Sequence, residues 1–279
     1  MALDYVVKGP VNQINGRPVF RAVGTYINWE SIDADPNVIT ENSKRIAKRF
    51  APKSEPISEE PAAIVAYGKS LADTWEHLKD FKVIFTCSGS HKFLLDRGIV
   101  PTHHVDSDPR PHKVEMLGIP HPDVNYLIAS ICHPSYFDLL ERHGIEKIYL
   151  WHLLFLESEI FNILPMGEWI MTGGNTVGPR AMKMARLSGY VNHHYFGFDA
   201  SDGYADHHPK EKEMQPFKFQ GKKYNTTSFW VDHAKMMFED LDRMPEITPT
   251  FYGDGLMQEM AKNYVPVNRA KLPMGVVKQ

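Results

Sequence analysis

The chain has 279 residues and a formal net charge of −3, with 43% hydrophobic and 23% charged residues. This composition is that of a globular protein and excludes disordered and fibrous classes. The length suits one large α/β domain, or one domain with an appendage. The near-neutral charge argues against strong nonspecific binding to nucleic acid, which needs a basic field.

The sequence predicts a cytoplasmic protein without a membrane span. Cys87 and Cys132 are the two cysteines, too few for a disulfide framework, and they fit a reducing compartment. The first residues lack the apolar segment of a signal peptide. The longest apolar stretch, residues 148–166, is interrupted by a histidine and two glutamates. A membrane helix needs about 20 mostly apolar residues, so this stretch does not qualify.

Three regions follow one another along the chain. Residues 1–60 contain few apolar runs and include one short predicted helix, residues 40–49; they predict an N-terminal extension or cap. The Pro- and charge-rich stretch 51–61 predicts a linker. We expect residues 61–205 to form the core and residues 206–279 to form a C-terminal segment that completes the site.

From residue 61 onwards, short apolar strands alternate with helices. The predicted strands are 62–67, 82–87, 103–106, 124–130, 147–151 and 193–198. The predicted helices are 71–81, 88–97, 134–143 and 177–188, followed by a long helix at 228–243. This alternation predicts a mostly parallel sheet with helices on both faces. In such a sheet, ligands bind beyond the carboxyl ends of the strands.

Two glycine-containing turns at those ends are candidate anion sites. Gly68, Lys69 and Ser70 follow the first core strand, and Ser88 follows the second. The second turn, with Gly174, Asn175 and Thr176, directly precedes the helix at 177–188. Backbone N–H groups at a helix start favour a phosphate. The alternative is that both are ordinary capped turns.

Acidic residues stand at two further strand ends. Asp106 and Asp108 could both reach one divalent cation, with Mg²⁺ bridging a diphosphate as the expected case. Alternatively, Asp108 caps a helix that begins at Pro109. Asp199 could bind a sugar hydroxyl, act as a base, or simply form a turn.

Histidines are frequent, at 14 residues, but no zinc-binding motif accompanies them. His207 and His208 lie in a polar loop after Asp199, and we expect one of them to be the catalytic base. His152, at another strand end, is the second candidate.

The order and spacing of these motifs resemble the 6-hydroxymethylpterin diphosphokinase MptE-like family. The residues that match its first block are Gly68, Ser70, Leu71, Gly98, Ile99, Pro101, Val105, Asp108 and Pro109. Residues 174–199 look like its second block. The resemblance implies a Rossmann-like fold and one of two activities. Archaeal members transfer diphosphate from ATP to a hydroxymethylpterin, and motility accessory factors are implicated in attaching nonulosonic acids to flagellin.

The same fold is similar to that of bacterial sialyltransferases, which use a CMP-sugar donor. Their nucleotide loops would correspond to residues 67–71 and to Cys87 and Ser88, where this chain lacks their asparagine. Their catalytic histidine, shortly before the C-terminal helix, has no counterpart here until His233, inside the predicted helix.

These observations predict a transferase with a nucleotide-activated donor. A glycosyltransferase that uses a nucleotide sugar is the first expectation, and a diphosphokinase that uses ATP is the alternative. A noncatalytic binding module that keeps the fold is the third. The acceptor could be a glycan, a protein, a pterin or a modified nucleic acid, and the protein could be a homo-oligomer.

Overall fold

A computed structural model describes residues 11–14, 17–20, 35–53, 58–153, 163–164, 166–171, 176–205, 214–264 and 275–277. At residues 11–14, 17–20 and 275–276 the structure describes the backbone only. Gly174, Asn175, His207 and His208 lie outside the described residues.

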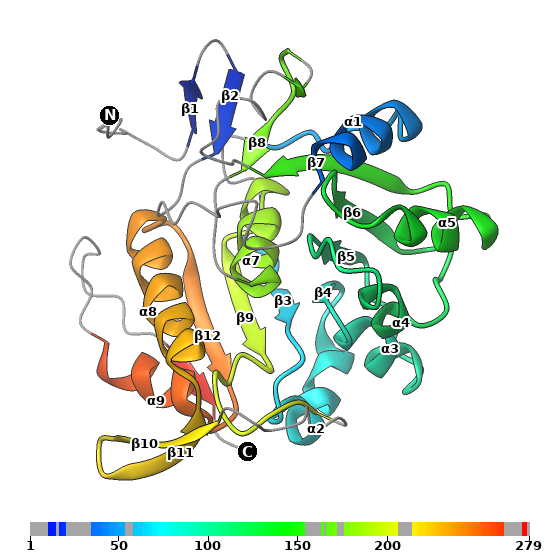
Figure 1. Ribbon diagram of the computed structural model, residues 1–279. Coiled ribbons are helices and arrows are strands. Elements are labelled where there is room, and N and C mark those ends of the chain that lie inside the picture. Colours follow the sequence, from blue (N-terminus) through cyan, green and yellow to red (C-terminus); the bar gives the residue numbers. More distant parts are fainter. Residues whose placement is uncertain are drawn as a thin grey trace.

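Within these residues, eleven strands form one sheet in the order β1-β2-β8-β7-β6-β5-β4-β3-β9-β12-β13 (Figure 1). Every pair in it is parallel except β1 with β2. The strands of this sheet are β1 (Val11–Ile14), β2 (Arg17–Phe20), β3 (Ala62–Val65), β4 (Val83–Cys87), β5 (His103–Asp106), β6 (Asn125–Ala129), β7 (Ile148–Leu153), β8 (Ile170–Met171), β9 (Asn192–Phe196), β12 (Thr248–Tyr252) and β13 (Gly275–Val277). The expected mostly parallel, Rossmann-like α/β fold is confirmed.

A separate hairpin joins β10 (Gln215–Phe219) to β11 (Lys222–Thr226). The helices are α1 (Pro36–Arg45), α2 (Leu71–Thr74), the 3₁₀ helix η2 (Trp75–Asp80), α3 (Ser90–Leu95), α4 (Lys113–Leu117), α5 (Pro134–Arg142), α7 (Val177–Leu187), α8 (Ser228–Arg243) and α9 (Leu256–Asn263). The helix expected at 71–81 is thus a single α-turn followed by a 3₁₀ helix. None of the described helices is long and apolar enough to cross a membrane.

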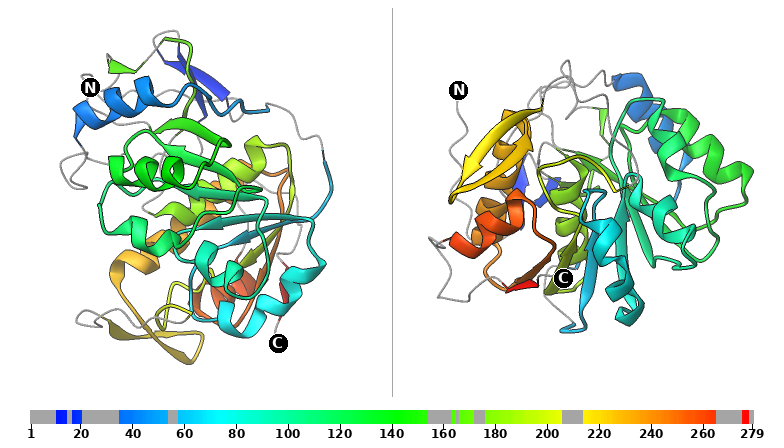
Figure 2. Two further views of the ribbon diagram at one scale, coloured as in Figure 1. Left: turned by 90° about the vertical axis from the view of Figure 1, so that its right-hand side faces the viewer. Right: turned by 90° about the horizontal axis from the view of Figure 1, so that it is seen from below.

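The chain reverses its direction of travel through the sheet at β3. Strands β3 to β8 are added successively on one side, and β9 then returns to the other side of β3. Such a reversal opens a crevice at the carboxyl ends of the two strands. The arrowheads of β3 and β9 point to the end of the molecule where α2 and the β10–β11 hairpin lie, which is seen from below in Figure 2.

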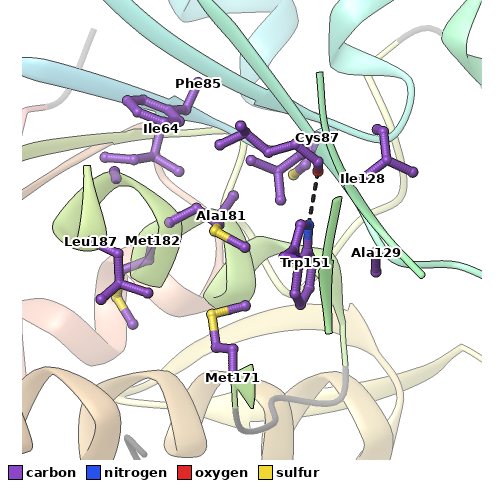
Figure 3. Packing of buried hydrophobic residues seen from close by; sticks show 14 of the residues in the cluster. Ile64, Phe85, Cys87, Ile128, Ala129, Trp151, Met171, Ala181, Met182 and Leu187 are labelled. Carbon is purple, nitrogen blue, oxygen red and sulfur yellow. Dashed lines mark hydrogen bonds between the residues drawn. The ribbon is translucent and has the colours of Figure 1, made fainter. Parts of the chain in front are cut away.

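Alternating side chains of the central strands pack on opposite faces of the sheet. Ile64 and Phe85 belong to the larger buried cluster, which includes Met182 of α7. Ala63 and Ile84, one position away, belong to a second cluster with residues of α2 and α3. Figure 3 shows the larger cluster, in which Trp151 Nε1 donates to the Leu127 carbonyl at 3.0 Å. Both faces of the sheet are therefore covered, and α7 is held over β3, β4 and β5.

The described part of the N-terminal region packs on this core. Asp35 caps α1 by accepting from the Asn37 N–H, so the helix begins before the expected residue 40. Buried Asn42 donates from its amide nitrogen to the carbonyls of Ser130 and Cys132. Arg45 pairs with Asp138 and Glu141 of α5. These contacts of Asn42 and Arg45 hold α1 against the core.

Candidate functional site

A pocket of about 770 Å³ lies beyond the carboxyl ends of β3, β4, β5 and β9. The N-terminus of α7 forms one of its walls, and α8 contributes aromatic and histidine side chains. Of the predicted site residues, it brings together Gly68, Ser88, Asp106, Asp108, Thr176 and Asp199. The pocket therefore occupies the place where the reversal in strand order predicts a ligand.

A backbone hydrogen bond joins the turn after β3 to the turn after β9. Gly68 N–H donates to the Gly197 carbonyl at 2.8 Å. A Cβ on Gly68 would lie 2.5 Å from both that carbonyl oxygen and Asp199 Oδ2, so only glycine fits without movement. The two strands at the crevice are consequently joined by a close backbone contact.

Asp199 is the acceptor that completes this junction. Its Oδ2 accepts from Ser70 N–H at 2.7 Å, and its Oδ1 accepts from Ser70 Oγ at 2.5 Å and Gln258 Nε2 at 2.9 Å. Ser70 makes no side-chain cap on the helix, as the alternative of an ordinary capped turn would require, and donates its hydroxyl to Asp199 instead. Burial raises the pKa of Asp199, while the hydrogen bonds from Ser70 and Gln258 oppose that shift. In this geometry Asp199 positions the turn of β3.

Asp106 and Asp108 follow β5 and have partners within the chain. Asp106 Oδ1 accepts from the backbone N–H groups of Ser107 and Asp108. Asp108 Oδ1 and Oδ2 accept from Arg110 Nε and Nη2 at 2.8 and 2.5 Å. Lys113 Nζ lies 3.6 Å from Asp108 Oδ2. The expectation that Asp108 caps a helix at Pro109 is wrong, because the next helix, α4, begins at Lys113.

The pKa of Asp108 is lowered. Burial alone would raise it, but the hydrogen bond from Arg110 and the charge of Lys113 outweigh burial. Among the described residues, no group of three His, Cys, Asp or Glu side chains could hold a metal ion. Asp108 is bonded to the guanidinium group of Arg110, and the magnesium site at Asp106 and Asp108 stays a prediction.

Arg180 is a functional candidate that the sequence motifs did not reveal. It lies on the first turn of α7, is buried, and donates from Nη1 to Ser107 Oγ at 2.6 Å. Burial lowers its pKa to about 10, so the guanidinium remains charged at neutral pH. With Arg110 and Lys113 it makes a third cationic side chain in the pocket wall.

Thr176 and His233 line the pocket and contact each other. Thr176 precedes α7 without making a side-chain cap, and its Oγ1 lies 3.1 Å from His233 Nδ1. Burial, and then the charge of Arg180, lower the pKa of His233 to about 4. His233 is therefore neutral at pH 7 and has a ring nitrogen available to accept a proton. Sequence analysis did not choose His233 as a candidate, because periodicity alone predicts that a histidine at this place in the helix is a packing residue.

Aromatic rings line the same pocket. Tyr67 and Tyr204 stack with ring centroids 5.7 Å apart, and Trp230 meets Tyr204 edge-on at 6.1 Å. Phe229 is exposed beside them. Ser88 holds a left-handed backbone conformation, with φ of 54°. Left-handed conformations of residues other than glycine are uncommon and concentrate at functional sites.

Other predicted residues lie elsewhere. Lys69 and Ser70 line a different pocket, which shares Asp199 and Ser201 with the first. His152 is buried away from both pockets, with Nδ1 2.9 Å from Ser130 Oγ and Nε2 2.5 Å from Glu168. Gly174, Asn175, His207 and His208 fall outside the described residues, so their roles remain predictions.

The fold is that of a doubly wound α/β protein, a class in which ligands bind at the reversal of the sheet. A family model described as 6-hydroxymethylpterin diphosphokinase MptE-like matches residues 37–204, which is more than half of the chain. The chain belongs to this family.

A solved structure described as a MAf glycosyltransferase from Magnetospirillum magneticum AMB-1 is similar, with a TM-score of 0.64 and 17% sequence identity. The match covers 84% of this chain and 38% of that one, so this chain spans well under half of the enzyme's length. At this identity the likeness shows a shared fold. The comparison with curated proteins gives no match.

Proposed function

We propose that this protein is a transferase that uses a nucleotide-activated donor, with a nucleotide sugar as the first candidate. One observation carries the proposal: the pocket at the reversal of the sheet combines three cationic side chains with an aromatic wall. Phosphates require the cations, and a base or sugar ring packs against the aromatic side chains. Membership in the 6-hydroxymethylpterin diphosphokinase MptE-like family and the fold shared with a glycosyltransferase support it.

In this proposal the donor phosphates lie among Arg110, Lys113 and Arg180. Arg110 and Arg180 each offer several N–H donors, and Arg110 already makes the bidentate contact that a phosphate would receive. The N-terminus of the eleven-residue helix α7 also faces the pocket, and its dipole favours an anion. The negative charge that develops on the leaving phosphate would be stabilised by the same groups.

His233 is the general base that the described geometry favours. It lies in the pocket and is neutral at pH 7, so it can take a proton from an acceptor hydroxyl. The oxygens of Asp199 are engaged by Ser70 and Gln258, which favours a positioning role for that residue. His207 and His208 stay candidates for the same task.

The predicted magnesium ion has no step in this proposal. The carboxylate of Asp108 is neutralised by Arg110 and Lys113, and one oxygen of Asp106 accepts two backbone N–H groups. When the donor binds, its phosphates take the place of Asp108 beside Arg110 and Lys113, and together with Arg180 these side chains supply the positive charge that a diphosphate needs.

Diphosphate transfer from ATP to a hydroxymethylpterin is the second candidate. The family's description favours it, and the rings of Tyr67, Tyr204 and Trp230 offer a flat heterocycle the same apolar wall. This reaction releases AMP, whereas glycosyl transfer does not consume ATP.

Calorimetric titration with UDP- and CMP-sugars, and in parallel with ATP, separates the candidates. We expect a nucleotide sugar to bind and ATP with a hydroxymethylpterin to yield no AMP. Release of AMP that depends on the pterin would replace the glycosyltransferase by the diphosphokinase. Absence of binding by every nucleotide and nucleotide sugar at millimolar concentration would refute both.

A further inference from the structure

A second pocket, of about 630 Å³, opens at the same edge of the sheet. It lies beyond the carboxyl ends of β9 and β12, with β11 of the hairpin along one side. Asp199 and Ser201 line both this pocket and the first one. The hydrogen-bonded pair of Ser70 and Asp199 therefore lies between two neighbouring cavities.

The side chains of the second pocket carry balanced charges. Lys69 and Lys223 line it, as do Asp73 and Asp254, and among the described residues none of the four makes an ion pair. Two ammonium groups and two carboxylates thus remain for a ligand. The sum of their charges is zero.

The remaining charged groups of the second pocket have partners. Lys222 Nζ lies 2.5 Å from Glu259, and Asp202 Oδ1 accepts from the side-chain and backbone nitrogens of Asn225. These contacts hold the β11 strand against α9 and the loop after β9. Lys69, Asp73, Lys223 and Asp254 are therefore the charged side chains of the pocket that can contact a ligand without losing an ion pair.

Tyr224 supplies a second and independent observation. It is 5% exposed and lines the pocket, and its hydroxyl has no hydrogen-bond partner among the described residues. A buried hydroxyl without a partner is unfavourable, and its survival in a native structure calls for a ligand or another explanation. A group that both donates and accepts hydrogen bonds would satisfy it.

We propose that the second pocket binds a neutral, hydroxyl-rich ligand, namely a carbohydrate that serves as the acceptor. A hydroxyl group donates to a carboxylate and accepts from an ammonium group, so interspersed aspartates and lysines match a sugar ring. A net anion would meet two carboxylates, and a net cation two ammonium groups. The acceptor role rests on the proposed transferase function; the binding of the carbohydrate does not.

The experiment uses the full chain and a panel of glucose, galactose, mannose, N-acetylglucosamine and lactose, with glucuronate as the anionic comparison. Saturation-transfer NMR identifies binders, and titration gives the dissociation constant. We expect a neutral saccharide to bind more tightly than glucuronate. Tyr224→Phe removes one hydroxyl and should weaken that binding by about fivefold, which is the effect of one neutral hydrogen bond.

Two controls keep a folding defect apart from a binding defect. Because the Tyr224 hydroxyl is unpaired, Tyr224→Phe should leave the unfolding midpoint of the free protein unchanged or higher. Arg110→Gln, in the first pocket, should leave saccharide binding intact. Asp254→Asn, on the exposed rim, should weaken saccharide binding without affecting nucleotide binding.

The inference is overturned if no neutral saccharide binds, if glucuronate binds better, or if Tyr224→Phe leaves the affinity unchanged. It is also overturned if Arg110→Gln weakens saccharide binding as much as Tyr224→Phe does. If saccharides bind as expected while no nucleotide does, the second pocket stands and the transferase proposal fails. The two failures are therefore distinguishable.

Discussion

At the scale of single residues, Arg110 is bonded to a carboxylate where a phosphate would bind. Asp108 receives its guanidinium in a bidentate contact, and the Arg110 side chain is about half exposed, at 52%. An exposed ion pair contributes only about 0.2–1 kcal/mol, so a ligand phosphate can replace Asp108 as the partner at little cost. Asp108 then competes with the donor for Arg110.

This competition predicts opposite effects of two neighbouring substitutions. Asp108→Asn should tighten nucleotide binding by about two- to fivefold, because Arg110 and Lys113 are released. Arg110→Gln should weaken it by about tenfold or more, because a charge-assisted hydrogen bond is lost. Titration calorimetry of both variants, with and without EDTA, measures the two effects. Loss of binding in Asp108→Asn, together with abolition by EDTA in the wild type, would instead identify Asp108 as a magnesium ligand.

At the scale of elements, a buried ion pair joins the two helices that carry the pocket wall. Lys183 Nζ of α7 lies 2.7 Å from Asp240 Oδ2 of α8, and both side chains are buried. Lys183 follows Arg180 by nearly one turn, and Asp240 follows His233 by two turns. The pair thus fixes the helix that carries Arg180 relative to the helix that carries His233.

Replacing one partner of the Lys183–Asp240 pair should lower the stability of the fold far more than replacing both partners. Lys183→Met leaves a buried carboxylate and should lower the free energy of unfolding by about 3–5 kcal/mol. In the double variant Lys183→Met/Asp240→Leu, much of the loss should be recovered, because no buried charge remains. Urea unfolding measures the stability of Lys183→Met, of Asp240→Leu and of the double variant. If the effects of the two single substitutions simply add in the double variant, the helices are not coupled through this pair.

How far the sequence predicts the structure also depends on the kind of element. Strands such as β4 and β6 are mostly apolar runs, and their boundaries follow from that pattern within a residue or two. β12 and the β10–β11 hairpin were not predicted, because their short segments alternate exposed and buried residues and include prolines. Their pairing is decided by contacts with distant elements.

The candidate site shows the same limit. Gly68, Ser88 and Asp106 were predicted because they stand at strand ends, and all three line the pocket. Arg180 and His233 stand inside helices, where sequence periodicity gives no sign that their side chains face a crevice. Asp199 was found, but its three hydrogen bonds come from Ser70 and Gln258, which are 129 and 59 residues away in sequence.

At the scale of the whole molecule, several histidines are buried in the neutral form. Burial is the main cause that lowers their pKa, to about 3 for His91 and His193 and about 4 for His103 and His233. These side chains pack among aromatic rings and hydrogen-bond partners, as His91 does with Tyr126. The histidine excess of the sequence is thus in part a property of the core.

The lowered pKa values predict that the fold loses stability in mild acid. Between pH 6.5 and about 4 the unfolded chain binds protons at these histidines and the folded chain does not, so stability falls as the pH falls. Each histidine contributes a slope of up to about 1.4 kcal/mol per pH unit. The thermal midpoint should therefore drop clearly from pH 7.5 to pH 5.5, where carboxylates stay ionised. An unchanged midpoint would mean that these histidines are solvated.

The central claim is that the pocket at the reversal of the sheet binds a nucleotide-activated donor through the chain's own cations. A thermal-shift screen of nucleotides and nucleotide sugars, each with Mg²⁺ and with EDTA, tests it most directly, because a ligand that binds the native state raises its midpoint. We predict that at least one nucleotide sugar raises the midpoint of the wild type, that EDTA preserves the shift, and that Arg110→Gln clearly reduces it. No shift with any compound at millimolar concentration, or an equal shift in Arg110→Gln, would contradict the claim.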